Sequence, residues 1–416
     1  MTALVVRADA HRLPLPDASV DLVVTSPPYF ALRSYTDGGE HYAGQVGAEA
    51  SPQEFIQALL AVTRECVRVL KPSGSLWVNL GDKYQSTAPG TYNAPRDIVA
   101  AGGRESEGGK ARGTFRPDMG VRPKSLSGLP WRYALGCIDE LGLILRAEVI
   151  WSKPNGLPES VTDRVRRSHE TWFHMVKEPR YFSAVDEIRE PHSDVSIRRA
   201  MPHRANPGRR GQEVYGPAMN GQTLDLSQMN HPLGKLPGSV WEVPTQPLTV
   251  PAHLGVDHFA AFPMEWPRRI IQGWSPSGIC VVCGEGRRPV TFTDLGVKER
   301  DTPQYDATGH ARHGTGNSTL GSRGPSAVIT GYVCACPTAT APTRPARVLD
   351  PFGGTGTTAL VAASLGRVGV SVDLSHDYSR LARWRTTDPG ERARALQVDK
   401  PPVEVDGQED LFGASA

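Results

Sequence analysis

Apolar and polar positions alternate along this chain of 416 residues in two ways, as short apolar runs and as amphipathic stripes. The clearest stripe predicts a helix over 51–70, with Ser51 as the N-cap, Pro52 at the first helical position and Glu54 completing a capping box. Cys66 lies on the apolar side of this helix, so we expect it in the core. Further helices are predicted over 129–141, over 359–365 and in a segment ending at Gln272.

The apolar runs predict buried strands that alternate with these helices, which is typical of an α/β fold. Gly366 is suited to end the last helix before the final strand. The predicted strands cover 4–6, 20–24, 76–80, 143–151, 347–349 and 368–372, and the segment 240–244 begins a return to the core.

Strand 20–24 leads into Thr25-Ser26-Pro27-Pro28-Tyr29. Proline has a fixed φ and no N–H, so carbonyls before the prolines point outward without an internal partner. Outward carbonyls, a hydroxyl and an aromatic face can together hold a planar ring that carries an exocyclic amino group. An ordinary strand exit, in which the two prolines only break the strand, is the alternative.

A second distinctive loop, 350–357, follows the strand at 347–349 and contains Gly353, Gly354 and Gly356. Glycines let the backbone approach a ligand closely. Asp373 ends the next strand about 20 positions later, where an acidic side chain can bind ribose hydroxyls. The loop lacks the full GxGxxG spacing and the P-loop lysine, so the pattern indicates a nucleoside site rather than a dinucleotide or P-loop site.

Composition narrows the function only a little. The chain has 43 glycines and 36 prolines, so much of it must be loop, and its net charge of +2 allows a basic DNA cleft on a neutral body. No signal peptide or long apolar segment is evident, so we expect a cytoplasmic protein without a membrane partner. In that compartment, six cysteines favour metal ligands or free thiols over disulfides.

The two loops together resemble those of the S-adenosylmethionine-dependent DNA amino-methyltransferases. The resemblance spans most of residues 4–383. Because the Ser-Pro-Pro-Tyr loop comes first and the glycine loop last, the order is similar to that of the circularly permuted beta class. The resemblance implies a Rossmann-like methyltransferase sheet and methylation of an exocyclic nitrogen in double-stranded DNA. Ser26 resembles the cytosine-N4 branch, and adenine-N6 methylation is the alternative.

The resemblance also assigns residues. It implies a catalytic loop formed by Ser26, Pro27, Pro28 and Tyr29. It implies a target-base pocket with Trp151 and Lys153, and a cofactor-covering segment, 258–263, that contains Phe262. It implies S-adenosylmethionine contacts from Asp9, Ala10, Phe262, Asp350, Pro351, Phe352, Gly353, Gly354, Thr355, Gly356, Thr357 and Asp373.

Residues 156–240 are the expected target-recognition region, because arginines there alternate with His169, Trp172, His174 and Tyr181. Arginine binds phosphates and guanine edges, although a solvated surface would look similar. The arginines are Arg164, Arg166, Arg167, Arg180, Arg198, Arg199, Arg204, Arg209 and Arg210, and the first three, with His169, are the predicted DNA contacts.

Two close cysteine pairs, Cys280–Cys283 and Cys334–Cys336, have a spacing that fits a structural zinc site, with free thiols as the alternative. The segment Gln408–Phe412 resembles a bacterial sliding-clamp-binding peptide. The predicted division of the chain is a catalytic half at 1–155 with a mobile insert at 84–127, target recognition at 156–240, a return to the core at 241–279, a zinc ribbon at 280–340, a cofactor half at 341–385 and a flexible tail at 386–416.

The expected reaction is direct methyl transfer to a base flipped out of the duplex, by a bacterial or phage enzyme with a cognate restriction enzyme as a partner. Methylation of RNA or of a protein glutamine is disfavoured by the order of the loops. The remaining alternative is a non-catalytic, zinc-containing DNA-binding protein, against which the intact Ser26, Tyr29 and Asp373 argue.

Overall fold

The computed structural model describes residues 2–31, 36–37, 40–41, 44–85, 90–92, 114–116, 119–156, 158–193, 231–256, 261–294, 326–337 and 341–400. Contacts between residues divide the chain into two compact units. The first contains 1–183, 238–287 and 340–416, and the second contains 184–237 and 288–339. Among the described helices, none has the length and apolar character needed to cross a membrane.

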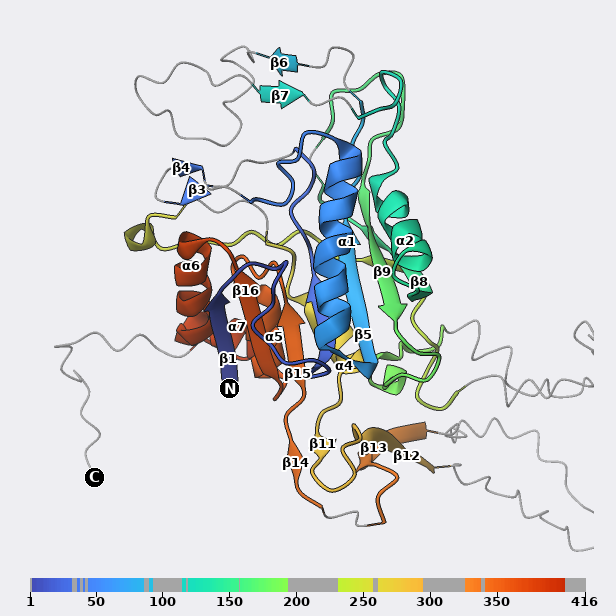
Figure 1. The fold of residues 1–416 in the computed structure, drawn as a ribbon. Coiled ribbons are helices and arrows are strands. Elements are labelled where there is room, and N and C mark those ends of the chain that lie inside the picture. Colours follow the sequence, from blue (N-terminus) through green and yellow to red (C-terminus); the bar gives the residue numbers. More distant parts are fainter. Residues whose placement is uncertain are drawn as a thin grey trace, which may run out of the picture. The chain divides into compact units, whose positions relative to one another are not determined.

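An eight-stranded sheet organises the first unit (Figure 1). The strands lie in the order β1-β16-β15-β2-β5-β9-β8-β10, and β9 runs antiparallel to both of its neighbours while the other pairs are parallel. The bounds are β1 Thr2–Arg7, β16 Val368–Asp373, β15 Arg347–Asp350, β2 Val20–Thr25, β5 Leu70–Leu80, β9 His169–Val176, β8 Ile144–Ser152 and β10 Val240–Glu242. This arrangement confirms the predicted α/β fold.

Strands β2 and β15 are direct neighbours although more than 300 residues separate them in the chain. Leu22 pairs with Val348, and Val23 pairs with Leu349. Because the two strands are parallel, the Ser-Pro-Pro-Tyr loop and the glycine loop leave the sheet at the same edge. The two motifs from opposite ends of the sequence therefore meet in space.

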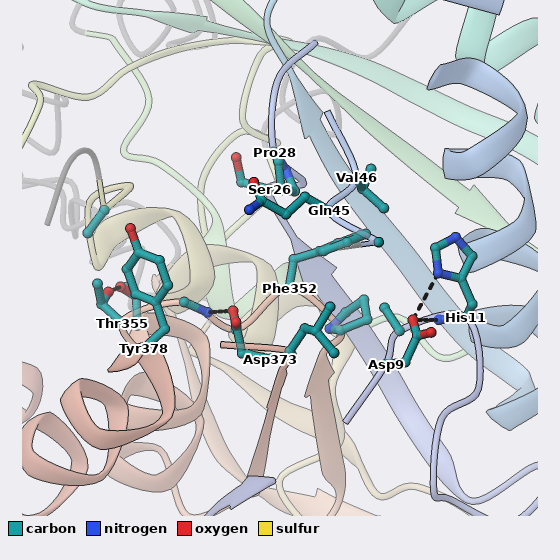
Figure 2. Close-up of a pocket in the computed structure, with 18 of the residues that line it drawn as sticks. Asp9, His11, Ser26, Pro28, Gln45, Val46, Phe352, Thr355, Asp373 and Tyr378 are labelled. Atoms are coloured by element: carbon teal, nitrogen blue, oxygen red, sulfur yellow. Dashed lines mark hydrogen bonds and ion pairs between the residues drawn. The ribbon is translucent and has the colours of Figure 1, made fainter. Parts of the chain in front are cut away.

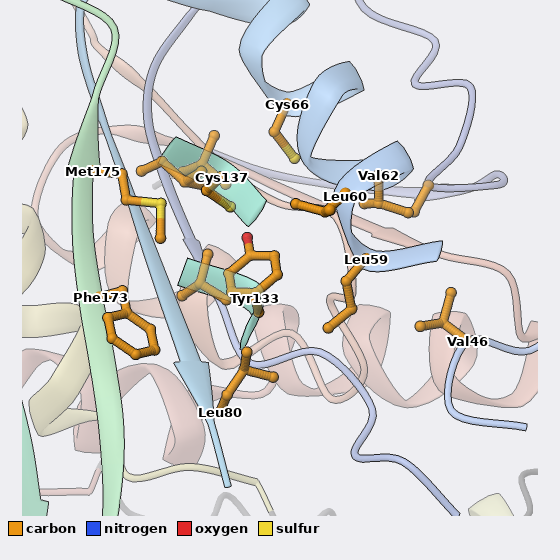
Figure 3. Packing of buried hydrophobic residues seen from close by; sticks show 14 of the residues in the cluster. Val46, Leu59, Leu60, Val62, Cys66, Leu80, Tyr133, Cys137, Phe173 and Met175 are labelled. Carbon is orange, nitrogen blue, oxygen red and sulfur yellow. The ribbon is translucent and has the colours of Figure 1, made fainter. Parts of the chain in front are cut away.

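One face of the sheet carries a largely aliphatic hydrophobic core with a few aromatic rings, under two helices, α1 Pro52–Val69 and α2 Leu129–Asp139 (Figure 3). The capping box of α1 is present as predicted. Cys66 is buried, as expected, and so is Cys137, and burial raises the pKa of Cys137 to about 12 and that of Cys66 further. Neither thiol is therefore suited to nucleophilic chemistry.

The opposite face is aromatic and lies against α4, Glu265–Trp274. Trp266 stacks on Trp172 and on Trp241 with ring centroids 5.0 Å apart in each case. His174 stacks on Trp77 at 4.5 Å, and burial lowers its pKa to about 3, so it is neutral at pH 7. Trp172 and His174, which alternate with arginines in the expected target-recognition region, lie in β9 and are buried in the core.

The C-terminal part is more ordered than predicted. Three helices follow the glycine loop: α5 Thr357–Ser364 packs on β15 and β16, α6 His376–Thr387 packs on β1 and β16, and α7 Pro389–Leu396 packs on α5 and α6. The predicted flexible tail at 386–416 is wrong up to Leu396, because Asp388 caps α7 by accepting from Glu391 N at 2.8 Å. Arg385 and Glu391 also form a buried ion pair between α6 and α7. The segment Gln408–Phe412 lies outside the described residues.

The second unit contains an antiparallel hairpin, β12 Arg288–Asp294 with β13 Ser326–Val333. A short helical turn, η2 Val185–Ile188, and a bridge between Glu190 and Lys235 belong to the same unit. The structure therefore divides the chain differently from the prediction, because residues up to 183 belong with the sheet. Arg198, Arg199, Arg204, Arg209 and Arg210 lie outside the described residues.

Small pairings complete the described fold. In the predicted insert at 84–127, β6 Gly90–Tyr92 pairs with β7 Thr114–Arg116, and Tyr84 bridges to Leu126. The remaining short elements are β3 Thr36–Asp37, β4 Glu40–His41, β11 Ile279–Cys280, β14 Thr343–Arg344 and the turn η4 Ala252–Leu254.

Candidate active site

Two adjoining pockets lie where β1, β2, β5, β15 and β16 end. Ser26, Pro28, Ala261 and Phe262 line both of them, so the catalytic loop forms part of the boundary between the pockets. The first pocket, shown in Figure 2, is lined by Asp9, Ala10, His11, Ser26, Pro28, Gly44, Gln45, Val46, Ala261, Phe262, Pro351, Phe352, Gly353, Gly354, Thr355, Thr357, Asp373, Leu374 and Tyr378.

The glycine loop forms one wall of the first pocket. Its backbone conformation and close packing disfavour residues with a side chain at several positions. Gly354 and Gly356 have φ values of +48° and +75°. A Cβ atom on Gly353 would lie 1.9 Å from Ser371 Oγ on β16, so glycine is required there for close packing. Of the predicted cofactor residues in this loop, Pro351, Phe352, Gly353, Gly354, Thr355 and Thr357 line the pocket.

Acidic side chains stand at two places in the same pocket (Figure 2). Asp373, at the end of β16, accepts from Gly354 N at 2.8 Å and from Ser375 N at 2.9 Å. Burial raises the pKa of Asp373 to about 6. Asp9 follows β1; burial raises its pKa, but hydrogen bonds from His11 outweigh this effect and leave the pKa below its usual value.

Asp350 connects the two loops. It is buried behind the pocket lining and accepts from Thr25 Oγ1 at 2.6 Å and from Thr358 Oγ1 at 2.9 Å. Burial raises the pKa of Asp350 to about 6. Because Thr25 directly precedes Ser26, this carboxyl group ties the start of the glycine loop to the start of the catalytic loop.

Arg385, which the sequence did not point to, supports the glycine loop from α6. Its guanidinium donates to the hydroxyls of Thr355 at 2.8 Å and Thr357 at 2.6 Å, and it pairs with Glu391 at 2.8 Å. A buried arginine needs such a set of acceptors. The only sequence signal for Arg385 was the pair of threonine hydroxyls in the loop. Those hydroxyls do not indicate which residue donates to them.

The second pocket brings together the catalytic loop and the predicted target-base residues Trp151 and Lys153. The indole of Trp151 is fixed, since Nε1 donates to Val243 O at 2.7 Å. Lys153 Nζ lies 4.1 Å from the centroid of the Trp151 ring. The full lining is Ser26, Pro27, Pro28, Tyr29, Asn79, Trp151, Lys153, Glu170, Thr245, Gln246, Pro247, Ala261 and Phe262.

The ring of Tyr29 is held at both its edge and its hydroxyl. The hydroxyl donates to Glu170 Oε2 at 2.6 Å and accepts from Asn79 Nδ2 at 3.0 Å. A Cβ atom on Gly81 would lie 2.8 Å from a ring carbon of Tyr29, so the ring packs against the Gly81 backbone. Sequence reasoning missed Asn79 and Glu170, although a buried asparagine near the end of an apolar strand was a usable signal.

Three of the predicted DNA contacts, Arg164, Arg166 and Arg167, lie in the segment between β8 and β9, and His169 is the first residue of β9. Arg164 stacks over the Tyr84 ring at 3.9 Å and pairs with Glu159 at 2.7 Å. Arg166 and His169 are exposed. Arg167 lies 3.8 Å from the buried carboxylate of Asp82. The loop therefore presents cationic groups near the second pocket, and their contact with DNA remains a prediction.

Comparisons with known proteins agree on one family. A family model described as DNA methylase (N6_N4_Mtase) matches residues 20–282. The Type II methyltransferase M.SmaI of Serratia marcescens is 30% identical over 368 residues, which cover 88% of this chain and 83% of that protein. M.XycI of Xanthomonas campestris pv. cyanopsidis is 41% identical over 186 residues, but the match spans only 57% of that relative and 44% of this chain.

A solved structure titled PvuII DNA methyltransferase (cytosine-N4-specific) is 16% identical to this chain. The alignment covers 96% of this chain and 94% of that one, with a TM-score of 0.49.

Proposed function

Since this chain belongs to the DNA methylase family, we propose that it transfers the methyl group of S-adenosylmethionine to N4 of cytosine in double-stranded DNA. The observation that carries the proposal is the pair of adjoining pockets that share Ser26 and Pro28. One pocket has the features of a nucleoside site, and the other has an aromatic ring and outward acceptors. A donor in the first and a base in the second would meet at the catalytic loop.

The first pocket offers acceptors and apolar surface that suit S-adenosylmethionine. Asp373 uses its oxygens for two backbone N–H groups and retains lone pairs for ribose hydroxyls. In this assignment Asp9 accepts from the adenine amino group, and Phe262, Phe352 and Tyr378 offer apolar surface. When bound, the cofactor supplies a methyl carbon attached to a positively charged sulfur, which is reactive toward a nitrogen lone pair.

The second pocket is suited to a base that has left the duplex stack, because the amino nitrogen of a paired base is otherwise occupied. In this assignment the Tyr29 ring stacks on the base. The hydroxyl of Ser26 and the carbonyl of Pro27 accept hydrogen bonds from the amino group. These acceptors draw the nitrogen lone pair out of conjugation and aim it at the methyl carbon.

The residues of the chain contribute position and electrostatics more than base strength. The Ser26 hydroxyl is far too weak to remove a proton from an amine before transfer. The proton therefore leaves after the new bond has formed, and no covalent link between the protein and the base is needed. This agrees with the buried, unreactive thiols of Cys66 and Cys137.

The proposal is tested by incubating the protein with mixed-sequence duplex DNA and labelled cofactor, followed by mass spectrometry of the nucleosides. We expect 4-methylcytosine. A 6-methyladenine product would keep the two-pocket mechanism but assign the adenine alternative, and cofactor binding without label in DNA would contradict the proposal. Ser26→Ala is the matched variant, and it should bind DNA but transfer little label.

Structural zinc is part of the proposal. The spacing of Cys280, Cys283, Cys334 and Cys336 supports it, as does the local turn at the first pair, where Gly284 has φ +75° and donates its N–H to Cys280 O at 2.9 Å. Metal analysis should find one zinc per chain, and Cys283→Ser should lower that content. A metal-free native protein with four titratable thiols at these positions would contradict the assignment.

Two partners follow from the same reasoning. The relatives are named Type II methyltransferases, which supports a cognate restriction enzyme, and the segment Gln408–Phe412 supports a sliding clamp. Deleting residues 408–412 should abolish clamp binding measured by calorimetry and leave methyl transfer to free DNA unchanged. Binding by the truncated chain would remove the clamp from the proposal.

A further inference from the structure

An ion pair between Lys153 and Glu170 lies in the second pocket. The ammonium and carboxylate are in direct contact, and the two side chains are only 19% and 16% exposed. Lys153 directly follows β8, and Glu170 in β9 lies opposite Trp151 in the register. Removing two charges from solvent is costly unless their other donors and acceptors are also used. The remaining contacts of Glu170 therefore indicate its role.

The second oxygen of Glu170 binds two neighbours, one from the loop after β2 and one from β5. It accepts from the Tyr29 hydroxyl at 2.6 Å and from Asn79 Nδ2 at 3.0 Å. Because a carboxylate only accepts, these contacts fix the direction of the hydrogen bonds around it. Tyr29 must donate its hydroxyl proton to Glu170, and Asn79 must turn its nitrogen rather than its oxygen toward the carboxylate.

Asn79 connects the hydrogen bonds around Glu170 to Ser26. Its Nδ2 atom lies 3.4 Å from Ser26 Oγ, and the residue is fully buried. Its Oδ1 atom has no hydrogen-bond partner among the described residues. If a donor to Oδ1 set the orientation of the Asn79 amide, Oδ1 would have a partner. The contact between Nδ2 and Glu170 therefore determines the orientation. The two N–H groups of Asn79 face three acceptors, Glu170, Tyr29 and Ser26, so one N–H is shared between two of them. The contact with Ser26 leaves a lone pair of its hydroxyl available for another donor, such as the amine of a base.

We propose that Glu170 is a positioning residue for methyl transfer, which sets the Tyr29 ring directly and the Ser26 acceptor through Asn79. The inference rests on the proposed function, because the groups that Glu170 positions are those assigned to the target base. Lys153 holds the carboxylate from the other side. Glu170 acts through these neighbours and need not contact the base.

The test is a set of single-turnover transfer rates at saturating cofactor, on a duplex that the wild-type protein methylates. Glu170→Ala should lower the rate on the order of 10²-fold, because small misplacements of reacting groups are this costly. Glu170→Gln keeps an acceptor for Tyr29 and should stay within about tenfold of the wild type. Glu178→Ala, exposed just beyond the other end of β9, is the matched control and should not change the rate.

A double-mutant cycle with Tyr29→Phe distinguishes positioning from general damage. If Glu170 acts through the tyrosine hydroxyl, Glu170→Gln combined with Tyr29→Phe should be no slower than the slower single variant. Cofactor affinity and melting temperature should change little in these two near-isosteric variants.

Additive losses would overturn the direct link from Glu170 to the Tyr29 ring, and a wild-type rate in folded Glu170→Ala would overturn the whole inference. Both outcomes leave the proposed function intact. A wild-type protein that transfers no methyl group to DNA would overturn both.

Discussion

The two pockets are built in different ways. The first pocket depends largely on backbone geometry within 350–357, with two acidic side chains, Asp373 at the end of β16 and Asp9 just after β1. The second depends on side chains from four different strand ends, including Tyr29, Asn79, Lys153 and Glu170. A pocket wall built by backbone geometry depends less on each side chain, whereas a network of side chains is sensitive to each member. The two pockets should therefore fail in different ways when they are altered.

The largest difference is expected from Tyr29→Ala, which removes the stacking ring from the second pocket. Stacking and positioning together should make the transfer rate fall on the order of 10²-fold or more. Cofactor affinity should stay at the wild-type value, because Tyr29 is not part of the first pocket's lining. Single-turnover kinetics and calorimetry measure the two quantities. A matching loss of cofactor affinity would show that the pockets are not separate.

Asp373→Asn tests the first pocket in the same way. Asparagine offers one acceptor oxygen where the carboxylate accepts from Gly354 N and Ser375 N and, in the proposed function, from the ribose hydroxyls. The dissociation constant of the cofactor should rise roughly 30-fold, as expected for losing a hydrogen bond to a charged group. Calorimetry gives the constant. An unchanged constant would remove Asp373 from the cofactor site.

Gly81→Ala is a more subtle change in the second pocket. The added Cβ atom would lie 2.8 Å from the Tyr29 ring, so the ring must shift. We expect the transfer rate to fall about tenfold with cofactor affinity unchanged. Gly238→Ala is the matched control, because its added Cβ meets nothing within 4 Å. Equal rates for the two variants would contradict the packing role of Gly81.

The smallest effect concerns pH. Burial raises the pKa of Asp373 to about 6, so the carboxylate that accepts from the ribose is lost as the pH falls through 6. Cofactor affinity should therefore weaken several-fold between about pH 7.5 and pH 5, and the effect is bounded by tenfold per unit. Asp373→Asn should show a flatter profile over the same range. Stronger binding in acid would contradict the assignment.

Local patterns predicted most of the fold. The capping box at Ser51 fixed the start of α1, and the apolar runs located the strands that build the sheet. The missed helix α7 also had a local signal, since Asp388 and Pro389 form a typical helix start that a polar composition concealed. The missed strand β9 is different. Its antiparallel place between β5 and β8 depends on tertiary pairing, so the sequence placed Trp172 and His174 in the target-recognition region rather than in the sheet.

The candidate site was predictable to the extent that it is local. The glycine loop, Asp373 and the Ser26–Tyr29 loop all carry their chemistry in adjacent residues, and the structure brings them together. Glu170 and Arg385 could not be found in this way, because each acts on a residue at least 28 positions away along the chain. Their importance depends on strand register and helix packing, which a single sequence does not state.

The most direct test of the two-pocket account is the single-turnover transfer rate of Tyr29→Ala and Asp373→Asn as the cofactor concentration is raised to saturation. The account predicts that Asp373→Asn recovers a rate close to that of the wild type, because only its cofactor affinity is impaired. Tyr29→Ala should remain slow at every concentration. Recovery of Tyr29→Ala at high cofactor, or a saturated Asp373→Asn protein that stays slow, would contradict the division of roles between the pockets.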